Sequence, residues 1–191
     1  MNNTVQTGRG YTTPEMIIVL ATLVIMASIA LPSFASVLRK AQSQTVIHNL
    51  ASTYQYARSA AISYRQPVVF CPRASDSTCG SDWLQGGIVF MDPDNNRMRS
   101  ERERLLAIFE PPPAGSSLQI RAALNKRYLR FMSNGMLENT AGSFVYCPPG
   151  ARDRDARTLI FTRNGRLRTG TDMNSDGILE NAEGQPLSCP S

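Results

Sequence analysis

The sequence predicts an α+β protein, with a long N-terminal kinked helix packed on an antiparallel β-sheet or a small β-sandwich. Two observations carry this prediction. A charge-free apolar run lies near the N-terminus and passes into a helical pattern, and seven short apolar segments, separated by Gly, Pro, Asp and Asn, follow it. Segments at that spacing are typical of antiparallel strands, and one helix followed by a run of strands gives the α+β class.

The apolar run begins at Met16 and has no charged side chain before Arg39, which makes it 23 residues long. A helix of that length can cross a hydrocarbon core of about 30 Å. Glu15 stands directly before it. A secretory signal peptide is disfavoured, because the leader carries only Arg9 and the run exceeds the usual h-region of about 7–15 residues. An ordinary membrane anchor with a boundary Glu stays an alternative.

The helix is expected to continue beyond this run, from Pro14 to Ser63. Apolar residues recur there every three to five positions, broadly on one face of a helix. They are Leu38, Ala41, Val46, Leu50, Tyr54, Ala57 and Ala61. We expect this second half to place an apolar stripe beneath a sheet.

The predicted strands occupy the remainder, and Pro, Gly, Ser and Asn mark the turns between them. They cover residues 67–71, 87–91, 105–109, 117–122, 128–132, 143–147 and 158–162. Four cysteines stand at 71, 79, 147 and 189, and in an oxidising compartment they allow three pairings. We favour Cys71 with Cys79 and Cys147 with Cys189. A cysteine metal site is disfavoured, because no CxxC occurs and the single histidine is His48.

The junction Gly10–Tyr11, followed by Thr-Thr-Pro and Glu15, resembles the processing site of type IV pilins and pseudopilins. The resemblance implies that prepilin peptidase removes a leader of residues 1–10 and that Tyr11 becomes the methylated N-terminus. Glu15 would then pair with the α-amino group of a neighbouring subunit, and Pro32 would bend the helix. One departure is Pro14, where the family usually has an aliphatic residue; proline is tolerated in a first helical turn.

A second pattern, W-x-x-G-x-x-V-F-x-D, is formed by Trp83, Gly86, Val89, Phe90 and Asp92. It resembles the signature of the FimT/FimU/GspH family of minor pilins and pseudopilins, and the DPDNN stretch with Glu101 and Glu103 fits the same hairpin. Physically, Trp83 is expected to anchor this hairpin in the core.

This resemblance implies three regions: a leader (1–10), a transmembrane and assembly half-helix (11–38) and a periplasmic or extracellular head (39–191). It implies a single-pass inner-membrane protein that enters a pilus with other major and minor pilins, near the tip, and supports assembly, adhesion or twitching motility. The alternative is a type II secretion pseudopilin of the GspH kind.

Basic charge is concentrated in residues 121–168, where nine Arg and Lys126 face three acids, a net charge of +7. The segment TRNGRLRTG, residues 162–170, holds Arg163, Arg166 and Arg168, and its Asn-Gly pair predicts a type I′ hairpin. It resembles the arginine motif of FimT-type minor pilins that is implicated in DNA binding during natural transformation. By that resemblance the three arginines contact incoming DNA, with help from the loop that holds Arg152, Arg154 and Arg157. The alternative is a solvated basic face.

The acidic tail matches the calcium-loop pattern D-x-[DN]-x-[DN]-G-x₅-E. Its candidate ligands are Asp172, Asn174, Asp176, Ile178, Glu180 and Glu183, with Gly177 at the sharp turn. The flanking helices of an EF-hand are not evident, so the alternative is an ordered acidic loop. A partial copy of the pattern starts at Asp92, but Arg97 takes the glycine position, and we expect no metal there.

Enzymatic function is disfavoured by the sequence. It contains no HExxH, G-x-S-x-G, P-loop or dinucleotide-binding motif. Asp92 and Asp94 are paired carboxylates, but they lie among Pro and Asn, which predicts a role in a turn.

Overall fold

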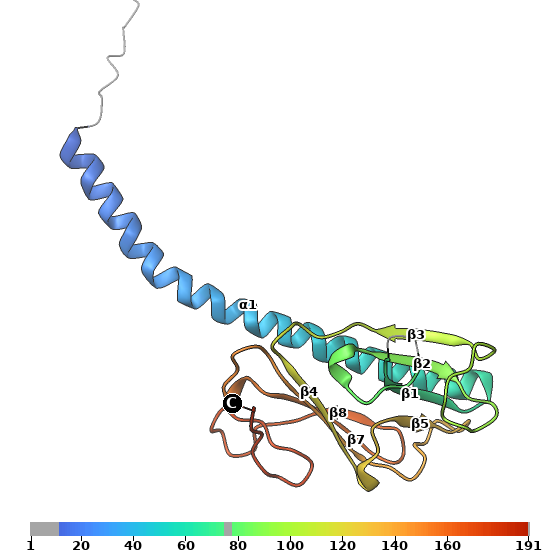
Figure 1. Ribbon diagram of the computed structural model, residues 1–191. Helices are drawn as coiled ribbons and strands as arrows, with labels where there is room; N and C mark the ends of the chain where they lie inside the picture. The colour runs from blue at the N-terminus through green and yellow to red at the C-terminus, as the bar shows by residue number, and fades with distance from the viewer. Residues whose placement is uncertain (1–11, 75–77, 191) are drawn as a thin grey trace, which may run out of the picture. The chain divides into compact units, whose positions relative to one another are not determined.

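The structure is a computed structural model that describes residues 12–74 and 78–190 (Figure 1). The chain divides into two compact units, Met1–Arg39 and Lys40–Ser191. One helix, α1 (Thr13–Tyr64), contributes residues to both units and matches the helix predicted over 14–63. The processing site predicted at Gly10 and Tyr11 lies outside the described residues.

In the first unit, residues 13–39 belong to α1, and Pro32 is accommodated within it. Glu15 lies in the first helical turn, where its carboxylate accepts a hydrogen bond from the Thr12 backbone N–H at 3.4 Å. Large apolar side chains on this segment are exposed, among them Val24 (68%) and Met26 (69%). Among the described residues, no helix combines the length and the hydropathy needed to cross a bilayer, so the predicted membrane span is not confirmed.

The second unit contains two four-stranded sheets. The first has the order β3-β2-β1-β5 and the second β4-β6-β7-β8, and every pairing is antiparallel. The strands are β1 (Val68–Pro72), β2 (Gly87–Met91), β3 (Leu105–Phe109), β4 (Ser117–Ala122), β5 (Leu129–Phe131), β6 (Gly142–Cys147), β7 (Arg157–Phe161) and β8 (Leu167–Thr169). Short 3-10 turns occupy η1 (Trp83–Gln85), η2 (Ala123–Asn125) and η3 (Asp153–Asp155). The predicted α+β class is confirmed, and β1–β7 correspond to the seven predicted strands.

A single core joins the C-terminal half of α1 to both sheets, which lie against it in Figure 1. The helix contributes a buried stripe that starts at Val46 and includes Leu50, Tyr54 and Ala61. The stripe predicted from the sequence begins too early, because Leu38 and Ala41 are exposed. The apolar spacing extends to residues before Val46, which is the first apolar residue of the stripe that the core buries. Spacing alone therefore does not show where burial of the helix begins.

The W-x-x-G-x-x-V-F-x-D signature has a structural explanation. Trp83 is buried between the two sheets, with ring centroids 4.8 Å from Phe70 and 5.0 Å from Phe144. Gly86 has φ 81°, and a Cβ there would lie 2.4 Å from the carbonyl oxygen of Phe109, so only glycine fits. The predicted core role of Trp83 is therefore confirmed.

Both favoured disulfides are present. Cys71 pairs with Cys79 across a separation of 8 residues, and Cys147 pairs with Cys189 across 42 residues. The second bond holds the C-terminal tail against the second sheet, where Leu187 packs in a small buried cluster with Val145.

Candidate functional site

The predicted arginine motif lies on the β7–β8 hairpin at one edge of the second sheet. Arg166 and Arg168 are exposed, whereas Leu167 between them packs against the main core. Because side chains alternate along extended chain, Arg168 on β8 and Arg166 directly before it lie on the face that points away from the core.

The hairpin turn differs from the predicted type I′ turn. The Gly165 N–H donates to the Thr162 carbonyl at 2.9 Å, and the Thr162 N–H donates to the Arg166 carbonyl at 3.0 Å. Within this turn Gly165 has positive φ (73°) and Asn164 does not. A type I′ turn requires positive φ at both central residues. This geometry is instead a three-residue loop, a type I turn followed by a left-handed glycine, and the predicted turn type is wrong.

Arg163 lies at the tip of this hairpin and is exposed. Its guanidinium donates a hydrogen bond to the side-chain oxygen of Asn139 at 2.6 Å, and its carbonyl accepts one from the Leu137 N–H at 2.8 Å. A neutral amide leaves the positive charge of Arg163 uncompensated. The tip therefore presents a cation whose direction is fixed by the neighbouring loop.

Helix α1 also holds the hairpin tip, through Arg58. Its Nε donates to the Gly135 carbonyl at 3.1 Å, and a terminal nitrogen lies 3.4 Å from the Asn164 carbonyl. Arg58 thus connects the turn after β5 in the first sheet with the β7–β8 turn in the second. A tip anchored in this way presents its arginines from a defined position.

A further arginine joins this face through the strand register. Arg121 on β4 pairs with Ser143, Ser143 with Ile160, and Ile160 with Arg168 on β8. These four residues form one row across the sheet, and the outer two, Arg121 and Arg168, lie about 14 Å apart by the usual strand spacing. No local sequence pattern places Arg121 on this face, because β4 and β8 are 45 residues apart in the chain and only the sheet order brings them together.

Arg157, the first residue of β7, lies on the opposite face from Arg168, while Arg152 and Arg154 lie in the loop before β7. Arg157 pairs in register with the buried Tyr146, so it lies on the helix-facing side of β7, and its guanidinium donates to the carbonyl of Ala156 at 2.8 Å. Arg152 and Arg154 are exposed in and beside η3, where Arg152 lies 4.0 Å from the carboxylate of Asp155.

The acidic tail loop has the local hydrogen bonds of a tight loop. Asp172 accepts from the Ser175 N–H at 2.7 Å and from the Gly177 N–H at 2.8 Å. Glu180 is buried and accepts from the Met173 N–H at 2.9 Å, whereas Glu183 is exposed. Among the described residues, the carboxylates of this loop do not gather into a group that could hold a cation. Calcium at this loop, with Asn174, Asp176 and Ile178 as further ligands, stays a prediction.

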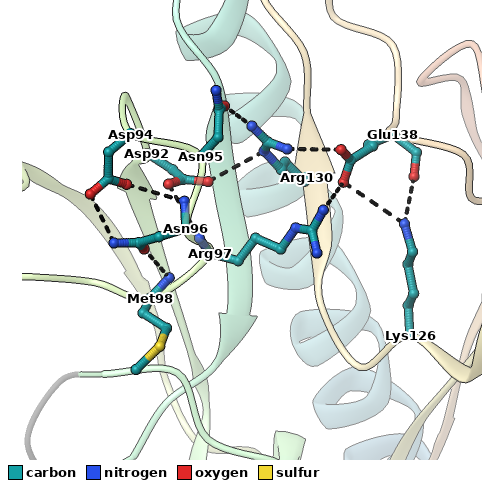
Figure 2. A network of polar contacts seen from close by, with 9 residues as sticks. All are labelled: Asp92, Asp94, Asn95, Asn96, Arg97, Met98, Lys126, Arg130 and Glu138. Carbon is teal, nitrogen blue, oxygen red and sulfur yellow. Dashed lines mark hydrogen bonds and ion pairs between the residues drawn. The ribbon is translucent and has the colours of Figure 1, made fainter.

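A network of buried charges surrounds Arg130 on β5. Its Nε lies 3.3 Å from Asp92, one terminal nitrogen lies 2.8 Å from Glu138, and another bonds the side chain of Asn95 (Figure 2). The carboxylate of Asp92 is fully buried, and this burial raises its pKa above the ordinary value. Asp92 therefore has a role beyond the turn predicted from the sequence, because it also forms a buried ion pair with Arg130.

Comparison with known proteins defines the class. A family model described as "Type II transport protein GspH" matches residues 46–165, which is more than half of the 191 residues. The chain therefore belongs to the GspH family of pilins and pseudopilins, as its signature residues predicted. No curated protein sequence in the comparison matches it.

Two solved structures are similar to the chain, and both are crystal forms of the type IV minor pilin FimU of Pseudomonas aeruginosa PAO1. The first has a TM-score of 0.51 and 23% identity over 77% of this chain and 94% of FimU. The second has a TM-score of 0.48 and 22% identity over 67% of this chain and 92% of FimU. The likeness to the first establishes a common fold, with an N-terminal helix packed on antiparallel sheets.

Proposed function

We propose that this protein is a minor subunit of a type IV pilus, incorporated through the N-terminal half of α1 and carrying the two-sheet head on the filament surface. The observation that carries the proposal is the apolar first half of α1, where side chains such as Ile18 (64% exposed) and Met26 (69% exposed) lack cover in the single chain. Contiguous exposed apolar surface of this kind marks a membrane or protein contact.

In this proposal, Glu15 sets the axial position of the subunit relative to its neighbour in the filament. An isolated carboxylate at the head of an apolar helix is costly to bury, and pairing with the α-amino group of an adjacent subunit offsets that cost. Cleavage after Gly10 creates this amino group at Tyr11. The subunit would wait in the inner membrane, be processed by prepilin peptidase, and then pack against major and minor pilins.

The test is incorporation into sheared filaments, followed with an antibody to the head domain. We expect the wild-type chain in the filament fraction, with Tyr11 as its methylated first residue by mass spectrometry. Glu15→Ala should remove the chain from filaments, and the matched control Glu101→Ala, an exposed acid far along the chain, should not. Equal incorporation of both variants, or a filament subunit that retains residues 1–10, contradicts the proposal.

A type II secretion pseudopilin is the second candidate, and the observation that favours it is the match to the family model named after GspH. The two candidates differ in phenotype. Deletion of a minor pilin reduces surface pili and twitching, whereas deletion of a pseudopilin blocks release of secreted enzymes and leaves twitching intact. Measuring twitching and the release of secreted enzymes in one deletion strain distinguishes the two candidates.

DNA capture is a further role of the head in this proposal. It is supported by the exposure of Arg163, Arg166 and Arg168 and by the location of Arg121 in the same register row as Arg168. Arginine binds phosphate oxygens in a bidentate manner, so this surface suits a nucleic acid backbone without sequence readout.

Mobility-shift titration of the full chain in detergent with duplex DNA tests this role. We expect binding that weakens with salt, with a log–log slope of about −3 if three phosphates are neutralised. Arg166→Ala/Arg168→Ala should flatten the slope by about two. The control Arg102→Ala removes another exposed arginine, from the β2–β3 loop, and should change little. Identical titrations for all variants contradict a role for the hairpin.

A further inference from the structure

The loop that joins β2 to β3 has the spacing of a calcium-binding loop. Asp92, Asp94, Asn96 and Glu103 occupy positions 1, 3, 5 and 12 of the twelve-residue pattern that begins at Asp92. One residue of the loop argues against a metal, because Arg97 takes position 6, where a sharp turn normally requires glycine.

The structure removes that objection. Arg97 has φ 64°, the left-handed conformation that glycine supplies in such loops. Its backbone N–H donates to the Asp92 carboxylate at 3.3 Å, so the chain turns back on its first ligand residue. The side chain of Arg97 meanwhile extends away to Glu138, with which it forms an ion pair at 3.6 Å (Figure 2). Arginine at position 6 is therefore compatible with a closed loop.

Three carboxylates of the loop converge. One carboxylate oxygen from each of Asp92, Asp94 and Glu103 lies within 4.8 Å of the others. Glu103 is only 7% exposed, and its Oε1 is buried with no hydrogen-bond partner, while its other oxygen accepts from the Ser100 N–H at 2.7 Å. A buried carboxylate oxygen with no partner is unfavourable, and a cation bound among the three groups would satisfy it.

Only one of these three carboxylates forms an ion pair between the described residues. Between the described residues, Arg130 forms an ion pair with Asp92, while neither Asp94 nor Glu103 has a cation within 4.0 Å. Glu138 instead forms ion pairs with Arg97, Lys126 and Arg130 (Figure 2). Asp94 and Glu103 thus converge with Asp92 without forming an ion pair between the described residues, beside an unsatisfied buried oxygen, which is a local environment that favours a cation.

We propose that the loop of residues 92–103 binds one Ca²⁺ ion. The ligands would be side-chain oxygens of Asp92, Asp94, Asn96 and Glu103 and the backbone carbonyl of Met98, which are the hard oxygen donors that calcium takes six to eight of. The site lies between β2 and β3 and touches the Arg130 network through Asp92. The bound ion fixes the hairpin that carries the family signature.

The tail loop provides an internal comparison. There the Gly177 N–H at position 6 donates to the Asp172 carboxylate at position 1, at 2.8 Å, as the Arg97 N–H does to Asp92. The carboxylates there do not form a converging group, so the backbone pattern alone does not distinguish the two loops. The convergence of buried Asp92 and Glu103 does.

The experiment is a calcium titration of the full chain in detergent, read by calorimetry and by thermal unfolding in Ca²⁺, Mg²⁺ or EDTA. We expect one site with a Kd of about 10⁻⁴–10⁻³ M, as in extracellular calcium modules. Five-millimolar calcium should raise the Tm by roughly 3–6 °C, and magnesium should raise it less. An unaltered Tm together with no calorimetric binding overturns the proposal.

Variants locate the site. Asp94→Asn and Glu103→Gln should each lose the calcium-dependent Tm rise, whereas Glu101→Gln, which removes an exposed acid of the same loop, should keep it. Asp172→Asn should also keep it. Asp94 is exposed, so its variant remains informative if Glu103→Gln fails to fold. A Tm rise that survives in Asp94→Asn, or that is lost in Asp172→Asn instead, overturns the assignment to this loop.

Discussion

Asp92 and Arg130 form a buried ion pair that joins the loop after β2 to strand β5, with 3.3 Å between the Asp92 carboxylate and the Arg130 Nε. The side chains are 0% and 5% exposed. Arg130 lies on the edge strand of the first sheet, and the same guanidinium bonds Glu138 and Asn95. Asp92, the last residue of the family signature, thus connects the β2–β3 hairpin to β5 at the opposite edge of the sheet.

We expect Arg130→Met to destabilise the chain by about 3–5 kcal/mol, because it leaves Asp92 buried without a counter-charge. Adding Asp92→Asn to this variant should recover part of the loss, since no uncompensated charge then remains. Urea unfolding of both variants and of Asp92→Asn alone measures the coupling. The matched control Arg102→Met changes an exposed arginine and should stay within about 0.5 kcal/mol of wild type. Equal losses in the single and double variants argue against a coupled pair.

The raised pKa of Asp92 should make the free energy of unfolding depend on pH. Burial raises its pKa above the ordinary value of 3.8, so the folded chain keeps this proton to a higher pH than the unfolded chain does. The resulting stabilisation is complete below pH 3.8 and is lost as the pH rises through the folded-state pKa. In EDTA, Asp92→Asn should therefore gain stability relative to wild type as the pH rises. Saturating calcium should oppose this trend, and a difference that does not change with pH contradicts it.

Gly165→Ala should destabilise the β7–β8 hairpin. Gly165 has φ 73°, and a Cβ there would meet the Gly135 carbonyl oxygen at 2.3 Å and the Arg58 Nε at 2.7 Å. We expect a loss of about 2–4 kcal/mol from backbone strain and overpacking together. Gly150→Ala is the control, because Gly150 has φ 63° with nothing within 4 Å, and it should lose about 1 kcal/mol. Equal losses would show that the contact with Arg58 and Gly135 adds nothing.

The sequence predicted the architecture well, because each element has a local signal. Apolar spacing marked the helix, turn residues separated the strands, and the Cys spacing favoured the observed disulfides. The hairpin turn was mispredicted, since Asn-Gly suits both a type I′ turn and a three-residue loop. Strand β8 was absent from the predicted set, because only three residues, Leu167–Thr169, pair with β7.

The candidate sites depend on features that a single sequence does not contain. Arg121 joins Arg168 only through the order β4-β6-β7-β8, which no local pattern encodes. The same limit applies to the loop after β2. In the sequence, Arg97 at the glycine position argues against a cation. In the structure, the Arg97 backbone adopts the left-handed conformation that glycine would supply. The convergence of Asp92 with Glu103 depends on packing, which the spacing of these residues does not reveal.

The two disulfides should contribute unequally to stability. In the chain-entropy model, a bond that closes a longer loop restricts the unfolded chain more. Replacing Cys147 and Cys189 by serine opens a loop with a separation of 42 residues and should cost about 4 kcal/mol. Replacing Cys71 and Cys79 opens a separation of 8 residues and should cost about 2.5 kcal/mol. Urea unfolding measures each difference, and a larger loss for the shorter loop contradicts this ranking.

Tyr54 at the centre of the core should tolerate loss of its hydroxyl but not of its ring. The side chain is fully buried, with its ring centroid 4.9 Å from that of Phe131, and its hydroxyl has no hydrogen-bond partner. Burial raises the pKa of Tyr54, so the group is a neutral and unpaired O–H at physiological pH. Removing an unpaired buried donor relieves its desolvation penalty, and we expect Tyr54→Phe to gain up to about 1 kcal/mol.

Tyr54→Ala separates the hydroxyl from the ring, because it opens a cavity among both sheets and the helix and should cost about 3–5 kcal/mol. Thr158→Val provides the matched polar control. The Thr158 hydroxyl is equally buried but donates to the Phe144 carbonyl at 2.8 Å, so its loss should cost about 1–2 kcal/mol. Thermal and urea unfolding of the three variants should give opposite signs for Tyr54→Phe and Thr158→Val. A comparable loss in both would mean that the Tyr54 hydroxyl has a partner in solution.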